Sequence, residues 1–213
     1  IEDKAVAATL AFSAWMRELI RERRGKGGDN LLMELIRAES EQGKLSEDEL
    51  VTTAILMLNA GHEATVHGIG NGIKALLEQK ATSGIGEGHV EEIMRFDAPL
   101  HMFTRYALED LEWNGLRLKK GEVIGLLLGA ANRDPAKFSE PDRFIPSRDN
   151  ASQNVSFGAG IHFCIGAPLA RLEMEVALPI LFERLPKLRL AEPPRYRDTY
   201  HFHGLERLQV LLR

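Results

Sequence analysis

Apolar side chains recur at helical spacing through the first eighty residues of the chain. The first run of them ends in a basic segment, Arg21–Arg24, before Gly25, and cations in a last turn suit the negative end of the helix dipole. A short second helix is predicted from Leu31, with Asp29 or Asn30 as its cap. The apolar positions of the first run are Val6, Leu10, Ala14, Trp15, Leu19 and Ile20.

A third helix is predicted to follow Ser46, which forms a capping box with Glu49, and to run to about Gln79. Its middle is rich in small residues, although each glycine there costs about 1 kcal/mol relative to alanine. Either another helix packs closely against these positions, or a large group lies against the backbone, or the helix is locally distorted. The small residues are Ala60, Gly61, Ala64, Gly68, Gly70 and Gly72.

From residue 100 onward the pattern changes to short alternating runs separated by turn residues. The Asn114-Gly115 pair lies between two such runs and predicts a β-hairpin over residues 111–118. Four further features are predicted: a strand over 123–128, a long loop over 134–155, a helix over 167–184 and a strand pair near 188 and 208–212. The predicted fold class is therefore mainly α with small β-sheets (α+β).

Composition and charge narrow the classes of function. The chain has 213 residues and a formal net charge of -4, which argues against a nucleic-acid partner. Its longest charge-free apolar stretch, residues 123–131, is far shorter than the roughly 20 residues of a membrane span. The first residues are charged and lack an apolar core, so no signal peptide is expected there, and a single cysteine suits a reducing compartment. We therefore expect a cytoplasmic protein with no membrane partner.

The strongest chemical signal is the segment 157–166, FGAGIHFCIG, which contains the only cysteine, Cys164. Its glycines allow positive φ angles and leave room for a flat ligand to approach the backbone. Cys164 directly precedes a predicted helix, whose positive dipole end stabilises a thiolate. Such a thiolate is a metal ligand or a nucleophile, whereas a lone cysteine is ordinarily a small buried structural residue. The glycines, aromatic residues and histidine around Cys164 favour a chemical role.

This segment resembles the FGxGxHxCxG haem-binding loop of the cytochrome P450 family, the haem-thiolate monooxygenases, at every fixed position. The resemblance implies that Cys164 is the axial thiolate ligand of the iron in haem b (iron protoporphyrin IX). It also implies that Phe157 packs beside the thiolate, and that His162 and Arg105 reach haem propionates. The other residues that the resemblance assigns to haem binding are Gly158, Gly160, Gly166 and His101.

Two further motifs occur in the family's order. Glu92 and Arg95 resemble the ExxR motif, and Pro141–Phe144 resembles the later motif that supplies a second arginine. The resemblance implies a buried salt-bridged triad of Glu92, Arg95 and Arg143, with Arg148 as the alternative to Arg143. Taken alone, a glutamate and an arginine three residues apart are a routine pair on a helix surface.

The middle of the long helix, AGHEAT at residues 60–65, resembles the family's oxygen-activation segment. The resemblance implies that Glu63 relays protons from solvent toward dioxygen; the alternative is an ordinary solvent-facing glutamate. Ala64 stands where the family usually has threonine, so the threonine hydroxyl is missing. Its place is taken by a substrate hydroxyl or a water, or by Thr65 if the helix bulges. The positions implied to face the substrate are Ala60, Gly61, Thr65, Met102, Phe103 and the turn Tyr200-His201-Phe202.

The resemblance covers nearly all of residues 1–213 but only the carboxy-terminal half of the family pattern. Residues 1–99 form a helical part, and residues 100–213 contain the hairpins, the cysteine loop and the helix after it. The segment Lys80–His89 is shorter than the family usually has between its long helix and its ExxR helix.

The activity implied by the resemblance is insertion of one oxygen atom from dioxygen into a small apolar molecule. Electrons come from a ferredoxin and its reductase, and Arg171 matches a family position that docks the ferredoxin. A solvated helix arginine is the alternative for Arg171. The alternative function is a non-catalytic or incomplete haem-binding fragment. A cysteine hydrolase built on Cys164 and His162 is less favoured, because it explains neither the glycines nor the other motifs.

Overall fold

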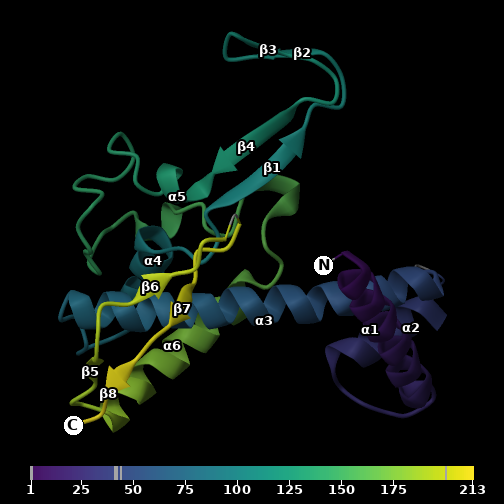
Figure 1. Ribbon diagram of the computed structural model, residues 1–213, viewed down its shortest axis with the longest axis horizontal. Coiled ribbons are helices and arrows are strands. Elements are labelled where there is room, and N and C mark those ends of the chain that lie inside the picture. The colour runs from purple at the N-terminus through teal and green to yellow at the C-terminus, as the bar shows by residue number, and fades with distance from the viewer. Residues whose placement is uncertain (1, 41–42, 44, 200) are drawn as a thin grey trace. The chain divides into compact units, whose positions relative to one another are not determined.

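Figure 1 shows a computed structural model of the chain, which describes residues 2–40, 43, 45–199 and 201–213. The chain divides into two compact units, Ile1–His62 and Glu63–Arg213, and the long helix α3 (Glu47–Glu78) belongs to both. In the parts of the chain that the structure describes, no helix combines the length and the apolar composition needed to cross a membrane.

The first unit consists of α1 (Glu2–Arg23), α2 (Leu31–Ser40) and the first half of α3. The cap of α2 is Asn30, whose Oδ1 accepts a hydrogen bond of 3.1 Å from the Met33 amide. The sequence left Asp29 open as an alternative, and the hydrogen bond selects Asn30.

The capping box at the start of α3 is confirmed in both directions. The Ser46 amide donates to Glu49 Oε2 at 2.8 Å, and the Glu49 amide donates to Ser46 Oγ at 3.3 Å. These two bonds satisfy amide groups that the first helical turn cannot pair internally.

The core of the first unit is built from fewer residues of α1 than the sequence predicts. Only Met16 and Ile20 of this helix are buried, whereas the predicted positions Val6, Leu10 and Trp15 are exposed. The buried cluster is completed by residues of α2 and α3, so the apolar stripe of α1 is covered only near its carboxy-terminal end. The whole cluster is Met16, Ile20, Met33, Ile36, Leu50, Val51 and Ala54.

In the residues that the structure describes, the second unit contains the rest of α3, two further α-helices of 10 and 18 residues, several shorter helical segments and four two-stranded sheets. Its helical elements are α4 (Glu87–Phe96), α5 (Leu128–Ala131), η1 (Ala151–Gln153), η2 (Gly160–His162) and α6 (Ala167–Arg184). Its strands are β1 (Met102–Tyr106), β2 (Leu111–Trp113), β3 (Leu116–Leu118), β4 (Val123–Leu127), β5 (Arg189–Leu190), β6 (Arg195–Tyr196), β7 (Leu205–Arg207) and β8 (Val210–Leu211).

All four sheets are antiparallel pairs: β1 with β4, β2 with β3, β5 with β8, and β6 with β7. The predicted hairpin is confirmed as β2–β3, with positive φ angles of 49° at Asn114 and 78° at Gly115, as its two-residue turn requires. Figure 1 shows this hairpin extending from the β1–β4 sheet, away from α4 and α6. The predicted strand pair near residues 188 and 208–212 is confirmed as β5–β8.

The core of the second unit lies between α3, α4 and α6 and explains some of the glycines of α3. A Cβ atom added at Gly72 would lie 3.3 Å from Ile93 of α4, and one at Gly68 would lie 3.7 Å from Met174 of α6. Close helix packing is therefore confirmed at these two positions. Gly70 is different, because an added Cβ would meet nothing within 4 Å. The buried cluster is Leu76, Val90, Ile93, Met94, Met174, Leu178, Phe182 and Leu188.

Candidate functional site

The cysteine loop turns tightly just before α6. The Cys164 amide donates a 2.9 Å hydrogen bond to the Phe157 carbonyl, which closes the loop. Gly158 and Gly160 have φ angles of 73° and 67°, so the predicted positive-φ positions are confirmed. Gly166 has φ -84° at the amino-terminal cap of α6, and its missing Cβ would lie 3.9 Å from Cys164 Sγ. The glycine at 166 thus has an ordinary φ angle, and an added Cβ would make only a van der Waals contact with the sulfur.

The surface around the thiol is apolar and accessible. Cys164 itself is exposed, and Ile161 and Ile165 on either side are 97% and 89% exposed. Phe163 is also exposed, at 51%. A free thiol among exposed apolar side chains is the surface that a flat apolar ligand would cover.

The donor set fits an iron ion that is held mainly by a macrocycle. Across the described residues, no group of three or more His, Cys, Asp or Glu side chains could hold a metal ion. Cys164 therefore offers a single thiolate, which is one axial position, as in haem-thiolate ligation. The residues present fit a haem better than an ion that the protein alone would coordinate.

Behind the loop, Arg171 packs against the loop instead of presenting its charge to solvent. Its guanidinium lies 4.5 Å from the centre of the Phe157 ring and pairs with Glu91, whose side chain is buried. Glu91 Oε2 also accepts a 2.9 Å hydrogen bond from Asn154 Nδ2. The Arg171 side chain is 24% exposed, and docking of a partner there stays a prediction. Its contact with Phe157 holds the aromatic residue of the cysteine loop.

The predicted triad forms, but with Arg148 in place of Arg143. Glu92 is fully buried and accepts hydrogen bonds of 2.8 Å from both Nε and Nη2 of Arg95. The Nε atom of Arg148 lies 3.2 Å from Glu92 Oε2, and its side chain is 4% exposed. The Arg143 side chain is 68% exposed and pairs with Glu140 on the surface. Only the backbone carbonyl of Arg143 reaches the cluster, so the second arginine is Arg148.

The two buried guanidinium groups also hold the long loop between α5 and the cysteine. Arg95 donates to the carbonyls of Asn132, Pro141 and Arg143 at 2.9–3.0 Å. Arg148 Nη2 donates to the Arg143 carbonyl at 3.3 Å. A loop with little secondary structure thus has its carbonyl groups paired with cations from the core.

A second chain of hydrogen bonds connects α4 to the cysteine loop. Asn132 Nδ2 donates to Ser156 Oγ at 2.7 Å, and Ser156 Oγ donates to the Met94 carbonyl at 2.6 Å. The Val155 amide donates to Asn132 Oδ1 at 2.8 Å. Asn132 and Ser156 are both buried, so the residue before Phe157 is fixed to the helix that carries Glu92 and Arg95.

His101 belongs to a stack of three aromatic rings that the sequence did not predict. Its ring lies 3.8 Å from that of His203, and the Tyr196 ring lies 3.8 Å from His203 on the other side. Asp97 holds the stack, with Oδ1 3.1 Å from His203 Nε2 and Oδ2 accepting a 2.5 Å hydrogen bond from Tyr196. Lys74 adds a cation 3.5 Å from Asp97 Oδ2.

Burial and charge set the protonation states in this stack. Burial and, after it, the charge of the neighbouring His203 lower the pKa of His101 to about 4, so His101 is neutral near pH 7. Burial alone would raise the pKa of Asp97, but hydrogen bonds from His203 and Tyr196 and the charge of Lys74 leave it below its ordinary value. Burial, followed by the charge of Asp97, raises the pKa of Tyr196 well above its usual range. As a haem-binding residue, His101 would therefore act through its neutral ring.

The two groups expected at haem propionates are both accessible. His162 is exposed in η2. Arg105 lies on β1 and is exposed, and its Nη1 donates a 2.8 Å hydrogen bond to the Thr104 carbonyl. Among the described residues, Arg105 forms no ion pair with a carboxylate, so its charge is available to an anionic group.

The segment predicted to activate oxygen, residues 60–65, lies on an uninterrupted α-helix. α3 is α-helical from Glu47 to Glu78, so the bulge that would bring Thr65 into the place of Ala64 is not present. The Glu63 side chain is 50% exposed and points its Oε1 to within 3.6 Å of His67 Nε2. Of the proposed substrate-facing positions, Ala60 and Gly61 are exposed on α3, while Met102 and Phe103 lie on β1.

The turn after β6 is described only in part. Tyr200 lies outside the described residues. Phe202 is half-buried and bridges Leu100, and its ring lies 5.6 Å from that of His67. Sequence reasoning missed His67, Asn71 and Asp97, although Glu63, His67 and Asn71 recur at four-residue spacing on a helix that is otherwise apolar there. That polar stripe was the available signal.

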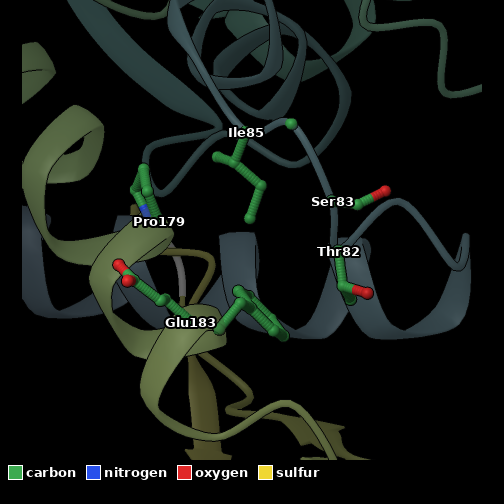
Figure 2. A pocket seen from close by; sticks show the side chains of 7 residues that line it. Thr82, Ser83, Ile85, Pro179 and Glu183 are labelled. Carbon is green, nitrogen blue, oxygen red and sulfur yellow. The ribbon is translucent and has the colours of Figure 1, made fainter.

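A groove with a volume of about 340 Å³ lies elsewhere in the second unit, between the segment after α3 and the far half of α6. Figure 2 shows Ile85 and Pro179 beside this space, while the Glu183 carboxylate points away from it. Pro179 lies twelve residues beyond the start of α6, or about 18 Å along the helix. The groove is therefore separate from the cysteine loop and is lined on one side by residues 82–85.

Comparisons with known proteins give the same assignment as the cysteine loop. The family model for cytochrome P450 matches residues 87–194. The putative cytochrome P450 140 of Mycobacterium tuberculosis is 42% identical over 211 residues, covering 94% of this chain and 48% of that protein. The vitamin D(3) 25-hydroxylase of Pseudonocardia autotrophica is 40% identical over 222 residues, covering 99% of this chain and 55% of that protein.

A solved structure shows that the fold is also shared. Myxobacterial cytochrome P450 CYP267B1, in complex with myristic acid, superposes with a TM-score of 0.93 at 36% identity and covers 99% of this chain and 55% of its own. The chain thus spans about half the length of the relatives that it matches. With a matching family model, relatives above 30% identity over nearly all its residues and a shared fold, the chain belongs to the cytochrome P450 family.

Proposed function

We propose that the protein is a haem-thiolate monooxygenase and that this chain is its carboxy-terminal, haem-ligating half. The observation that carries the proposal is the exposed Cys164 thiol on a glycine loop that is fixed from behind by buried ion pairs. When bound, haem b would supply an iron centre that activates dioxygen for insertion of one oxygen atom into a substrate.

Each residue of the site has a proposed task that its position supports. Cys164 would hold the haem iron through its sulfur, and the hydrogen bond from its amide to the Phe157 carbonyl closes the loop that carries it. His162 and Arg105 are exposed polar groups that bind the propionates. Glu63 carries protons from solvent, and its half-exposed side chain suits exchange with water. A substrate hydroxyl or a water, rather than Thr65, replaces the hydroxyl that Ala64 lacks.

The substrate is proposed to be a small apolar molecule. Two matched proteins support this class: one is named for hydroxylation of vitamin D(3), and one was solved with myristic acid. On this chain, Met102, Phe103 and Phe202 are the apolar side chains proposed to face it. The proposed electron donors are a ferredoxin and its reductase, in the cytoplasm, and the ferredoxin is proposed to dock near Arg171, whose side chain is 24% exposed.

The alternative is a haem-binding fragment without activity, and it is favoured by the coverage of only about half of each relative. The two proposals differ in spectrum and turnover. The intact protein is reduced under carbon monoxide: a Soret band at the thiolate position together with product formation supports the monooxygenase. A shifted band without turnover supports the fragment, and failure to bind haem contradicts both.

The axial assignment has its own test in Cys164→Ser. We expect this variant to lose the thiolate-type carbon-monoxide band while keeping its helical circular dichroism, because serine preserves the backbone bond to Phe157 and no other cysteine exists. Ile161→Ser, at a more exposed position of the same loop, is the matched control and should keep the band. An unchanged band in Cys164→Ser would show that another group ligates the iron.

A further inference from the structure

One histidine of α3 is buried with a free ring nitrogen. The His67 side chain is 6% exposed, and its Nε2 atom has no hydrogen-bond partner among the described residues. That atom lies 3.6 Å from Oε1 of Glu63, which is one turn earlier on the same helix and half exposed. A buried imidazole nitrogen without a partner is unfavourable, so its position needs an explanation.

The ring of His67 is held in place from the other side by a glycine. A Cβ atom added at Gly204 would lie 2.0 Å from His67 Nδ1, so no larger residue fits there without moving the ring. The turn that contains Gly204 is itself fixed, because the Gly204 carbonyl accepts a 2.9 Å bond from Arg197 and the His203 amide donates a 2.8 Å bond to the Pro99 carbonyl. The fixed ring directs Nε2 toward Glu63.

We propose that His67 is a positioning residue for Glu63: its Nε2–H donates a hydrogen bond that holds the Glu63 carboxylate. The distance from His67 Nε2 to Glu63 Oε1 is 3.6 Å, whereas a charge-assisted hydrogen bond is about 2.8 Å long. A small rotation of the half-exposed Glu63 side chain closes this difference. The arrangement of glutamate four residues before the imidazole is also the favourable order on a helix. In this role His67 supplies one N–H donor.

The proposal rests on the proposed monooxygenase function, in which Glu63 carries protons to the site. Because Ala64 has no hydroxyl to share this task, the orientation of the Glu63 carboxylate matters more here than in a chain with threonine at residue 64. A freely rotating carboxylate would deliver protons less often. More of the electrons from the donor would then be lost in hydrogen peroxide instead of being used to form product.

The contact is tested first without turnover, by ¹⁵N NMR of the histidine rings in the intact holoprotein. We expect Glu63→Gln to move the His67 Nε2 resonance and to leave that of His89 on α4 unchanged. Glu63 is half exposed, so this variant should keep the fold. An unmoved His67 resonance would overturn the proposal, whether or not the protein turns over.

The functional test compares two variants of His67. Its readout is the ratio of hydrogen peroxide to product formed while reduced nicotinamide is consumed. We expect His67→Leu to raise this ratio about tenfold, below the 10²- to 10⁴-fold of a complete acid–base group, because Glu63 remains. His67→Gln, whose amide places an N–H near the Nε2 position, should restore it. Gly204→Ala, which displaces the ring, should resemble His67→Leu. Equal ratios in the Leu and Gln variants would overturn the positioning role. A parent without any turnover would contradict the proposed function but leave the NMR result to decide the contact.

Discussion

At the scale of single residues, burial selects Arg148 over Arg143, the arginine that the sequence motif favours. Arg148 is 4% exposed against the buried carboxylate of Glu92, while Arg143, five residues earlier, is 68% exposed and pairs with Glu140. Both were candidates for the second arginine of the triad. Sequence spacing alone does not distinguish them, because the loop that carries them has no regular period from which to infer direction.

Arg148→Met should therefore lower the free energy of unfolding much more than Arg143→Met. Removing Arg148 takes one of two cations from a buried carboxylate and removes the hydrogen bonds to the Ser139 and Glu140 carbonyls, which costs about 3–5 kcal/mol. Removing Arg143 breaks a surface pair worth about 0–1 kcal/mol. Urea unfolding of both variants in the haem-loaded protein measures the difference, and equal losses would refute the role given to Arg148.

At the scale of secondary-structure elements, the glycines of α3 differ in whether close helix packing requires them. Gly70→Ala should raise the free energy of unfolding by about 0.5–1 kcal/mol, since helix propensity improves and the added methyl meets nothing within 4 Å. Gly72→Ala should gain less or lose stability, because its methyl would lie 3.3 Å from Ile93. Thermal unfolding of the two variants compares them directly. A larger gain at Gly72 would contradict the packing described between α3 and α4.

Elements with local signals could be predicted from the sequence. The Ser46–Glu49 box, the Asn114-Gly115 turn and the helix after Cys164 depend on residues that are close together in the chain, and all three are confirmed. The Asp97–His203 contact joins residues more than one hundred positions apart. It could not be predicted, because no local pattern indicates which distant polar groups share one buried site.

At the scale of the whole molecule, the ring stack should make stability depend on pH. The pKa of His101 is about 4 in the folded protein and near its ordinary value of 6.5 when unfolded, so the unfolded state binds more protons between these values. Stability should thus fall as the pH decreases from about 6.5 to about 4. The charged groups facing His101 are His203, Asp97 and Arg133. Asp97, whose folded pKa is lowered, loses its contribution at still lower pH.

The variant His101→Phe tests this dependence. Phenylalanine keeps an aromatic ring against His203 but has no proton to bind, so the slope of unfolding free energy against pH should become shallower between pH 6.5 and 4. His89, whose pKa is also lowered by burial, contributes equally to parent and variant and cancels from the comparison. His62→Phe, at an exposed position, is the control and should leave the slope unchanged. An identical slope in His101→Phe would assign the acid sensitivity to other groups.

The long loop between α5 and the cysteine has a consequence for proteolysis. A protease must draw several residues into an extended conformation, and the Arg143 carbonyl is held by both Arg95 and Arg148. Trypsin should therefore cleave after Lys119 or Lys120, in the exposed turn beyond the β2–β3 hairpin, well before it cleaves after Arg143. In Arg148→Met the order should change, and a fragment ending at Arg143 should appear early in the mass spectrum. In the parent protein, Arg143 would thus be an exposed arginine in an irregular loop that is protected from trypsin. The protection comes from Arg95 and Arg148, the two cations that bind its backbone carbonyl.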